Sequence, residues 1–231
     1  MKLLLFDLDG TILHARHTPG RVPFDLAMHD TFGVDVALRR MRPDGKTDPR
    51  IVTELLAQAG VGDEPDAAAF AAFHDALAAH LAAAIADGST RVEAIPGVPP
   101  LLETLARDDR FALGVLTGNL ERAAELKLRA AGLARFFPVG AFGSDHADRH
   151  VLPEMARARH RERSGVDVPL VDCVIIGDTP LDHAAARCNG MACVLVASGR
   201  IPLEELVALA PAAAFGDWSD AAAIHAALAE L

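Results

Sequence analysis

The sequence predicts an α/β protein built on a doubly wound parallel sheet, with a helical cap inserted near its N-terminus. Short apolar runs alternate with helical patterns along most of the chain, and three of these runs end in acidic or polar side chains. One long segment near the N-terminus lacks strand patterning altogether. Strands that alternate with helices are typical of a parallel sheet joined by crossover helices.

The expected strands are short runs rich in Val, Ile and Leu. Such runs suit a parallel sheet, because helices cover both of its faces and every strand side chain is buried. The four clearest runs are residues 2–6, 111–116, 173–176 and 193–196, and weaker candidates are 139–142 and 213–215.

Residues 23–87 are predicted to form only helices. Apolar side chains recur there at helical spacing, which indicates amphipathic helices that pack together. The recurring residues are Ile51, Leu55 and Leu56, and then Phe70, Phe73, Leu77 and Leu81. We therefore expect residues 1–15 and 95–231 to form the core domain and residues 16–94 to form an inserted cap.

Composition excludes several classes of partner. The chain has 231 residues, 51% of them hydrophobic, and a net charge of −10. An acidic protein lacks the basic surface that nucleic acid or an anionic membrane requires, so neither is expected as a partner. The 66–86 stretch is apolar but carries His74, Asp75 and His80, which argues against a membrane span. Both histidines are expected to pack or face solvent rather than bind a ligand.

Cysteine content indicates a reduced compartment. The chain has three cysteines, Cys173, Cys188 and Cys193, an odd number without zinc-ligand spacing. Three free thiols are typical of a cytoplasmic protein. The apolar run at the N-terminus is too short for a signal peptide, which agrees with that expectation.

The first motif is Asp7-Leu8-Asp9-Gly10-Thr11, directly after the first predicted strand. Side chains alternate along a strand, so Asp7 and Asp9 are expected to point to the same side. Two neighbouring carboxylates repel each other unless a cation lies nearby or one of them is protonated. A turn in which Asp9 caps the following segment is the alternative explanation.

The second motif is Thr117-Gly118-Asn119, between a predicted strand and a helix. The Thr117 hydroxyl and the backbone N–H groups of Gly118 and Asn119 would form an anion site near the N-terminus of that helix. Asn119 is also a good N-cap residue, with Gly132 at the C-terminal end of the helix.

The third motif, again with acids, is Gly177-Asp178-Thr179-Pro180-Leu181-Asp182. Thr179 and Asp182 match a capping box, and Pro180 suits the first turn of a helix. Asp178 needs another explanation, because it stands at the strand tip, where ligands bind in open α/β sheets.

The carboxyl ends of parallel strands share one crevice, so the acids of these separate motifs are expected to meet. Clustered carboxylates predict a hard cation with oxygen ligands, most simply Mg²⁺. A cation beside a hydroxyl group and helix N-termini predicts a site for a phosphoryl group.

These motifs, in this order and spacing, resemble those of the haloacid dehalogenase superfamily. The helical insert after the first strand resembles the cap of its phosphoglycolate phosphatase-like and β-phosphoglucomutase-like branch. The resemblance covers essentially the whole chain and implies a Rossmann-like core.

The resemblance also implies a role for each motif residue. Asp7 would be the nucleophile that forms an aspartyl-phosphate, and Asp9 would act as general acid and then as general base. Thr117 would bind a phosphoryl oxygen, with Gly118 and Asn119 in the substrate site. The implied Mg²⁺ ligands are Asp7, the backbone carbonyl of Asp9, and Asp178, with Asp182 close behind.

The chain departs from the family pattern where a lysine usually precedes the last acidic motif. Arg149 is the best candidate by position, because a guanidinium can clamp a phosphate. Lys127 is the reserve candidate, since it lies on the apolar face of its helix. About 12 Å of helix rise is expected to separate it from the strand tips.

The cap sequence Gly45-Lys46-Thr47-Asp48 resembles the loop that meets the leaving group in this branch, so Lys46 is expected to bind substrate. Asp48 would either share that role or cap the next helix. The expected function is Mg²⁺-dependent hydrolysis of a small phosphorylated metabolite.

Four alternatives remain. A phosphosugar mutase would use the same two acids, and a phosphonatase would need Lys46 for a Schiff base. A dehalogenase disagrees with the presence of Asp9. A regulatory binding module would leave Asp7, Asp9 and Asp178 clustered without a purpose.

Overall fold

A computed structural model describes residues 1–38, 41, 43–62 and 64–231 and confirms the doubly wound α/β architecture. Six strands form one sheet in the order β5-β4-β1-β6-β7-β8, and every neighbouring pair is parallel. The strands are β1 (Lys2–Phe6), β4 (Phe111–Leu116), β5 (Gly140–Ala141), β6 (Cys173–Gly177), β7 (Ala192–Val196) and β8 (Ala213–Phe215). All six predicted runs therefore contain a strand, although the 139–142 run contributes only two residues.

Strand β1 lies at the centre of the sheet and is buried on both faces. Leu4 and Phe6 pack into one hydrophobic cluster, whereas Leu3 and Leu5 pack into another on the opposite face. This alternation explains why β1 reads as a continuous apolar run. The first cluster includes side chains of α4 (Val98–Leu105), α5 (Glu121–Ala130) and α9 (Ala221–Glu230), and the second those of α6 (Leu152–Ser164), α7 (Pro180–Cys188) and α8 (Leu203–Ala208). Two short 3₁₀ helices, η2 (Ala134–Phe136) and η3 (Leu170–Asp172), complete the core.

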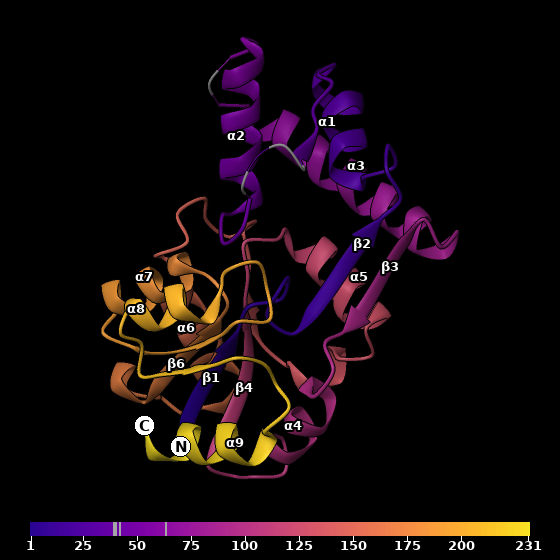
Figure 1. Ribbon diagram of the computed structural model, residues 1–231. Helices are drawn as coiled ribbons and strands as arrows, with labels where there is room; N and C mark the ends of the chain where they lie inside the picture. Colours follow the sequence, from indigo (N-terminus) through magenta and orange to yellow (C-terminus); the bar gives the residue numbers. More distant parts are fainter. Residues whose placement is uncertain (39–40, 42, 63) are drawn as a thin grey trace.

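In the described part of the insert there are three α-helices, α1 (Pro23–Phe32), α2 (Asp48–Ala59) and α3 (Ala67–Ala86). Phe73 of α3 packs against α1, since its ring centroid lies 5.1 Å from that of Phe24 and 5.9 Å from that of Phe32. Apolar side chains at helical spacing on α2 and α3 complete this third cluster. In Figure 1 the three helices lie beyond one end of the sheet, and both chain termini lie at the other end.

An antiparallel ribbon of β2 (Leu13–His17) and β3 (Thr90–Ala94) joins the insert to the sheet, as Figure 1 shows. Neither strand is predicted from the sequence. Each is short and mixes charged with small side chains, so neither has the apolar pattern on which strand prediction depends. The predicted boundaries after residues 15 and 94 fall within or at the end of this ribbon, and the division into two domains stays a prediction.

Helix α5 belongs to both parts of the molecule. Ala124 and Leu128 pack into the sheet cluster, whereas Leu120 and Ala123 pack into the cluster of the insert. The helix that follows the second motif therefore lies directly between the sheet and the inserted helices.

Helix α3 is long and apolar enough, by length and hydropathy, to cross a membrane, and no other helix in the described part of the chain passes that test. Its Phe73, Leu77 and Leu81 are buried in the cluster of the insert. The core helix of a folded domain passes the same test.

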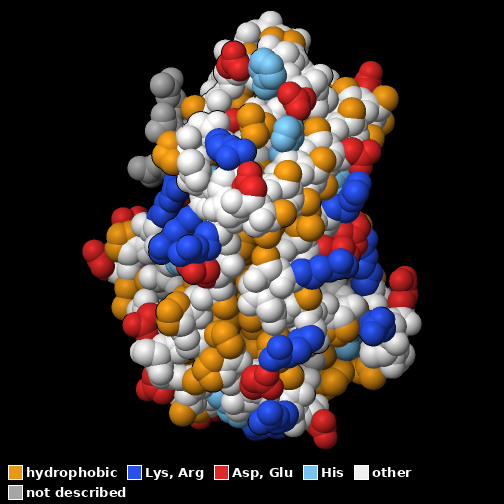
Figure 2. Space-filling view, turned by 90° about the vertical axis from the view of Figure 1, so that its right-hand side faces the viewer, with side chains coloured by type: hydrophobic (Ala, Val, Ile, Leu, Met, Phe, Trp, Pro, Cys, Tyr) orange, Lys and Arg blue, Asp and Glu red, His pale blue; other side chains and the backbone are white. Residues whose placement is uncertain are grey.

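The surface shown in Figure 2 mixes charges of both signs. Basic and acidic side chains alternate over this face, and hydrophobic side chains lie between them. Exposed apolar atoms scattered in this way are normal for a folded protein.

Candidate active site

Three acids from distant parts of the chain meet at one edge of the sheet. Asp7 follows β1, Asp178 follows β6, and Asp182 lies in the first turn of α7. One carboxylate oxygen from each lies within 4.8 Å of the others, and all three residues are buried. Their convergence agrees with the expectation that parallel strand ends share a crevice.

Asp178 is enclosed by backbone on two sides. Its Oδ1 accepts a hydrogen bond of 2.6 Å from the Thr11 hydroxyl. A Cβ atom at Gly10 would lie 2.5 Å from Asp178 Oδ2, and one at Gly199 would lie 1.8 Å from it. Only glycine fits at these two positions without moving the carboxylate.

Both carboxylate oxygens of Asp182 already accept hydrogen bonds from protein donors. Its Oδ2 accepts hydrogen bonds from the backbone N–H of Thr179 at 3.0 Å and the Thr179 hydroxyl at 2.7 Å, as the predicted capping box requires. Its Oδ1 accepts from the guanidinium of Arg149. These bonds suit a residue that supports the acid cluster from behind.

Arg149 is buried beside the proposed nucleophile. A guanidinium nitrogen lies 3.2 Å from Asp7 Oδ1 and also bonds Asp182. The Arg149 Nε has no hydrogen-bond partner within the described residues, so one donor remains for a ligand. This arrangement is consistent with the predicted phosphate clamp, which stays a prediction.

Lys127 also reaches the site, although we expected it to lie too far away. Its Nζ lies 2.6 Å from Asp9 Oδ2 and 2.6 Å from Asn119 Oδ1. The expectation was wrong because helix rise measures distance only along the axis from Asn119. Asp9 lies beyond the strand tip, on the loop that leads to β2, and the ribbon's other strand, β3, contacts α5. Arg149 and Lys127 therefore serve different acids.

Asn119 acts through its side chain. Its Nδ2 donates to Asp9 Oδ2 and to Thr117 Oγ1, each at 2.8 Å. The N-cap of α5 is Leu120 and not Asn119. Because Thr117 Oγ1 accepts from Asn119, its own hydrogen is free to point toward a ligand.

The N-terminus of α5 is already satisfied by protein acceptors. The Asn119 N–H donates to Thr117 Oγ1 at 3.3 Å, the Leu120 N–H to Asp48 Oδ2 at 2.9 Å, and the Glu121 N–H to Ser144 Oγ at 3.1 Å. Asp48 thus caps α5 and not its own helix, which neither alternative for this residue anticipated.

Burial and mutual repulsion raise the pKa values of two acids in the cluster. Burial is the largest influence on Asp7, and Arg149 opposes it, so that the pKa of Asp7 is about 6. Burial followed by the charges of Asp182 and Asp7 raises the pKa of Asp178 to about 8. The cluster therefore holds more negative charge than its surroundings compensate.

A divalent cation fits this donor set. Buried carboxylate oxygens are the ligands that Mg²⁺ prefers, and a cation would offset the repulsion that raises the two pKa values. Asp7 and Asp178 offer oxygens toward each other, while Asp182 stands behind them.

The pKa of Asp9 is shifted in the opposite direction from those of Asp7 and Asp178. Burial alone would raise its pKa, but the charge of Lys127 and hydrogen bonds from Lys127 and Asn119 hold the pKa of Asp9 below its usual range. The Asp9 carboxylate is therefore a stable acceptor at neutral pH.

A cavity of about 300 Å³ lies between the sheet edge and the inserted helices. Every predicted site residue except Asp178 and Asp182 lines it, as does Lys127. Asp48 also lines it, and so do His17 and Arg200, which sequence reasoning had not placed here. The insert adds apolar side chains, namely Phe24, Ile51, Leu77 and Leu81.

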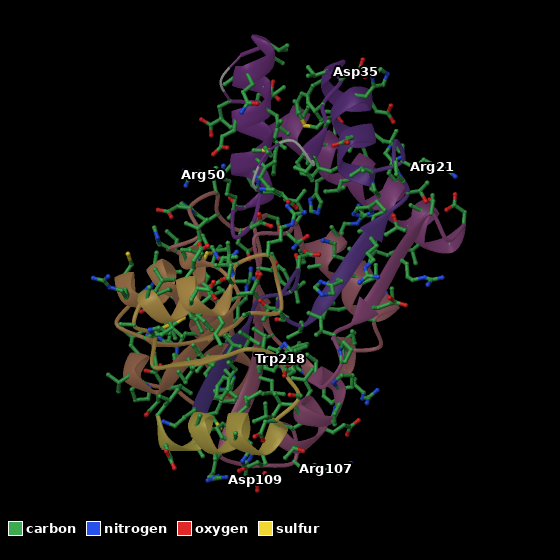
Figure 3. The ribbon with its side chains drawn as sticks, in the orientation of Figure 1. Arg21, Asp35, Arg50, Arg107, Asp109 and Trp218 are labelled. Atoms are coloured by element: carbon green, nitrogen blue, oxygen red, sulfur yellow. The ribbon has the colours of Figure 1, made fainter. Side chains whose placement is uncertain are left out.

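Sequence reasoning also missed the residues that support the first motif from behind. Trp218, labelled in Figure 3, donates from Nε1 to the Thr11 carbonyl at 2.8 Å. Ser198 donates to the Gly10 carbonyl at 2.8 Å. The only available signal was Ser198-Gly199-Arg200 directly after the β7 region, because loops at that edge of the sheet tend to carry function.

A parallel α/β sheet with an inserted helical cap, buried acids and two basic side chains at one edge defines a class of phosphoryl-transfer enzymes. The sequence model of the haloacid dehalogenase-like hydrolase family matches residues 1–190 of this chain. The chain belongs to the haloacid dehalogenase-like hydrolase family.

One curated relative agrees with this assignment, and solved structures share the fold. The chain is 32% identical to the phosphoglycolate phosphatase of Rhodospirillum rubrum over 226 residues, covering 94% of this chain and 90% of the relative. Its fold is similar to a hydrolase from Pseudomonas syringae, with a TM-score of 0.68, 21% identity and 95% of each chain covered. It is also similar to CbbY from Rhodobacter sphaeroides in complex with phosphate, with a TM-score of 0.68, 22% identity and 95% of each chain covered. The protein is a phosphatase of this family.

Proposed function

We propose that this enzyme hydrolyses a small phosphate monoester in a Mg²⁺-dependent reaction with Asp7 as the nucleophile. The observation that carries the proposal is the buried Asp7 carboxylate, which lies beside Asp178 and 3.2 Å from the guanidinium of Arg149. Mg²⁺ held by Asp7, Asp178 and the carbonyl of Asp9 would reduce the repulsion between an anionic nucleophile and an anionic phosphate.

The chain supplies the groups for both halves of the reaction. Asp7 attacks phosphorus, and the ester oxygen leaves with a proton that Asp9, a carboxylate in the free enzyme, first accepts from the monoanion of the phosphate ester. Asp9 then removes a proton from water, whose oxygen attacks the phosphorus of the aspartyl-phosphate and releases inorganic phosphate and free Asp7. Lys127 and Asn119 orient the Asp9 carboxylate for this second step. The Thr117 hydroxyl, the Gly118 N–H and Arg149 would hold the phosphoryl oxygens.

A phosphorylated short-chain carboxylate is the first candidate substrate. The 32% identical relative is named as a phosphoglycolate phosphatase. Lys46 and Arg200 line the cavity, and each pairs with an acid of the insert, Glu54 and Asp44 respectively. A substrate carboxylate could replace one of these acids as the partner of the cation.

The test is phosphate release from 2-phosphoglycolate, glucose 1-phosphate and phosphonoacetaldehyde, with and without Mg²⁺. We expect Mg²⁺-dependent release from 2-phosphoglycolate and a loss of at least about a thousandfold in Asp7→Asn. Asp75→Asn is the matched control, since Asp75 is an exposed acid on α3 that pairs only with Arg122 in the described structure.

Besides a lack of phosphate release from every tested substrate, three results would overturn the proposal. Activity that persists in Asp7→Asn would exclude Asp7 as the nucleophile. Isomerisation of glucose 1-phosphate without net phosphate release would favour a mutase. Release from phosphonoacetaldehyde alone, blocked by borohydride, would favour a phosphonatase that uses Lys46.

A further inference from the structure

The insert and the core are joined by hydrogen bonds at residues 45–48. The Asp48 N–H donates to the Gly118 carbonyl at 2.7 Å, and the Asp48 carboxylate accepts from the Leu120 N–H at 2.9 Å. The Thr47 hydroxyl donates to the Ala147 carbonyl at 2.6 Å. One short segment of the insert thus contacts two loops of the core, and one of these loops is the turn that carries Thr117.

The backbones of the two parts are in direct contact at this point. A Cβ atom at Gly118 would lie 2.0 Å from the Lys46 carbonyl oxygen, and one at Gly45 would lie 2.6 Å from Thr179 Oγ1. Thr47 and Asp48 are 1% and 9% exposed, respectively. Buried polar groups need partners, so these hydrogen bonds hold the insert in one docked position.

Helix α5 depends on this docking for its N-terminal cap. Helices α3 and α9 are capped by the residue that directly precedes each of them, Asp66 at 2.8 Å and Asp220 at 2.9 Å. Leu120 has no capping side chain of its own, and its N–H is satisfied by Asp48, 72 residues earlier in the chain. Undocking the insert would therefore leave this donor without its protein acceptor.

Like Asp48, Thr47 directs its side chain to the core and not to its own helix. It is the N-cap residue of α2, but its side chain makes no cap hydrogen bond to that helix. Its hydroxyl donates to the core carbonyl of Ala147 instead. Two adjacent residues that could cap α2 thus both direct their side chains to the core.

We propose that Asp48 is a positioning residue that couples docking of the insert to the order of the turn formed by residues 117–120. This inference rests on the proposed function, because that turn carries Thr117 and Asn119. Docking of residues 45–48 orders the turn, and an anion bound at the turn favours docking in return, since coupling between two binding events is reciprocal.

The experiment compares Asp48→Ala with Asp66→Ala and Asp220→Ala, which remove a helix cap within one part of the molecule. Asp48→Ala is expected to raise both the KM and the inhibition constant of inorganic phosphate about tenfold, with kcat within about threefold, because fewer molecules are docked. The two control variants are expected to change neither constant by more than about twofold. Hydrogen–deuterium exchange of the peptide that contains residues 117–121 is expected to accelerate only in Asp48→Ala.

Two further variants separate docking from simple loss of stability. Asp48→Asn keeps an oxygen acceptor for the Leu120 N–H and is expected to restore KM to within about threefold of the unmodified enzyme. Thr47→Val keeps the shape of Thr47 but removes its bond to Ala147, so it is expected to raise KM and the exchange rate in the same direction as Asp48→Ala. If Asp48→Ala does not fold, Thr47→Val carries the test, because a KM and an exchange rate equal to those of the unmodified enzyme would then overturn the proposal.

The proposal is overturned if Asp48→Ala matches the control variants in KM and exchange, or if Thr47→Val changes neither. An enzyme that releases no phosphate from any tested substrate would refute the proposed function and not this inference. In that case the exchange comparison decides, and equal rates in Asp48→Ala and the unmodified chain would reject it.

Discussion

Lys127 on α5 lies 2.6 Å from Asp9, 118 residues earlier in the chain, and its side chain is only 13% exposed. Arg149 meanwhile pairs with Asp7 and Asp182. Two basic side chains therefore pair with different acids of the site. The proposed nucleophile and the proposed acid–base thus each have a basic partner of their own.

Lys127→Met tests the partner of Asp9. We expect the free energy of unfolding to fall by about 1–2 kcal/mol, because Asp9 loses a charge-assisted hydrogen bond but remains partly solvated. We expect kcat to fall about 10- to 100-fold, because Asp9 loses its orientation. Arg129→Met, an exposed position on the same helix, is the control. A loss of stability without a change in kcat would reduce Lys127 to a structural role.

Arg149→Met tests the clamp on Asp7. Removing a buried cation leaves Asp7 and Asp182 uncompensated, and we expect a loss of about 3–5 kcal/mol in the free energy of unfolding. The pKa of Asp7 should rise further, since Arg149 is the main influence that opposes burial. Urea denaturation and steady-state kinetics provide the measurements. Arg149→Lys should recover part of the activity, whereas Arg163→Met, an exposed residue on α6, should retain all of it.

The charge of Asp48 should make stability depend on pH. Burial is the main cause that raises the pKa of Asp48 from 3.8 to about 6. A raised native pKa adds stability below the unfolded value, and this contribution is lost as the pH rises through the native value. Asn has no such titration. The free energy of unfolding of Asp48→Asn, relative to that of the unmodified chain, should therefore increase by up to about 3 kcal/mol as the pH rises from 3.5 to 7. Urea denaturation of metal-free protein at several pH values measures the difference, and a constant difference would contradict the assignment.

Gly199 and Gly216 form a matched pair for testing the support of Asp178. A Cβ at Gly199 would lie 1.8 Å from Asp178 Oδ2, whereas the nearest atom to one at Gly216 is a Leu203 carbon at 3.9 Å. Gly199→Ala should displace Asp178, weaken Mg²⁺ activation and lower kcat/KM at least about tenfold, because small misplacements of reacting groups are costly. Gly216→Ala should leave both unchanged. Mg²⁺ titration of activity is the measurement, and equal behaviour of the two variants would count against a metal role for Asp178.

Several features could be predicted from the sequence because they depend on local patterns. Residues 2–6 read as a buried strand, and Thr179 with Asp182 read as a capping box, since periodicity and capping act over a few residues. The ribbon of β2 and β3 could not be predicted in this way. Its two strands pair 73 or more residues apart in the chain and carry too few apolar side chains to give a pattern.

The site residues also fall into those that local patterns predict and those that they do not. Asp7, Asp9, Thr117 and Asp178 could be located because each follows an apolar strand, and parallel strand ends share an edge. The positions of Lys127 and Asp48 could not, because each depends on how α5 lies between the sheet and the inserted helices. Helix rise alone gave the wrong distance for Lys127.

The amino-acid sequence by itself determined which strands carry acids, that a helical insert follows the first strand, and which metal those acids would suit. Only the tertiary structure decided which cation meets which acid, and which residue satisfies the N-terminus of α5. The physical reason is one of range. Hydrophobic periodicity and capping act between near neighbours in the chain, whereas ion pairs and buried hydrogen bonds join residues by their distance in space, which packing sets.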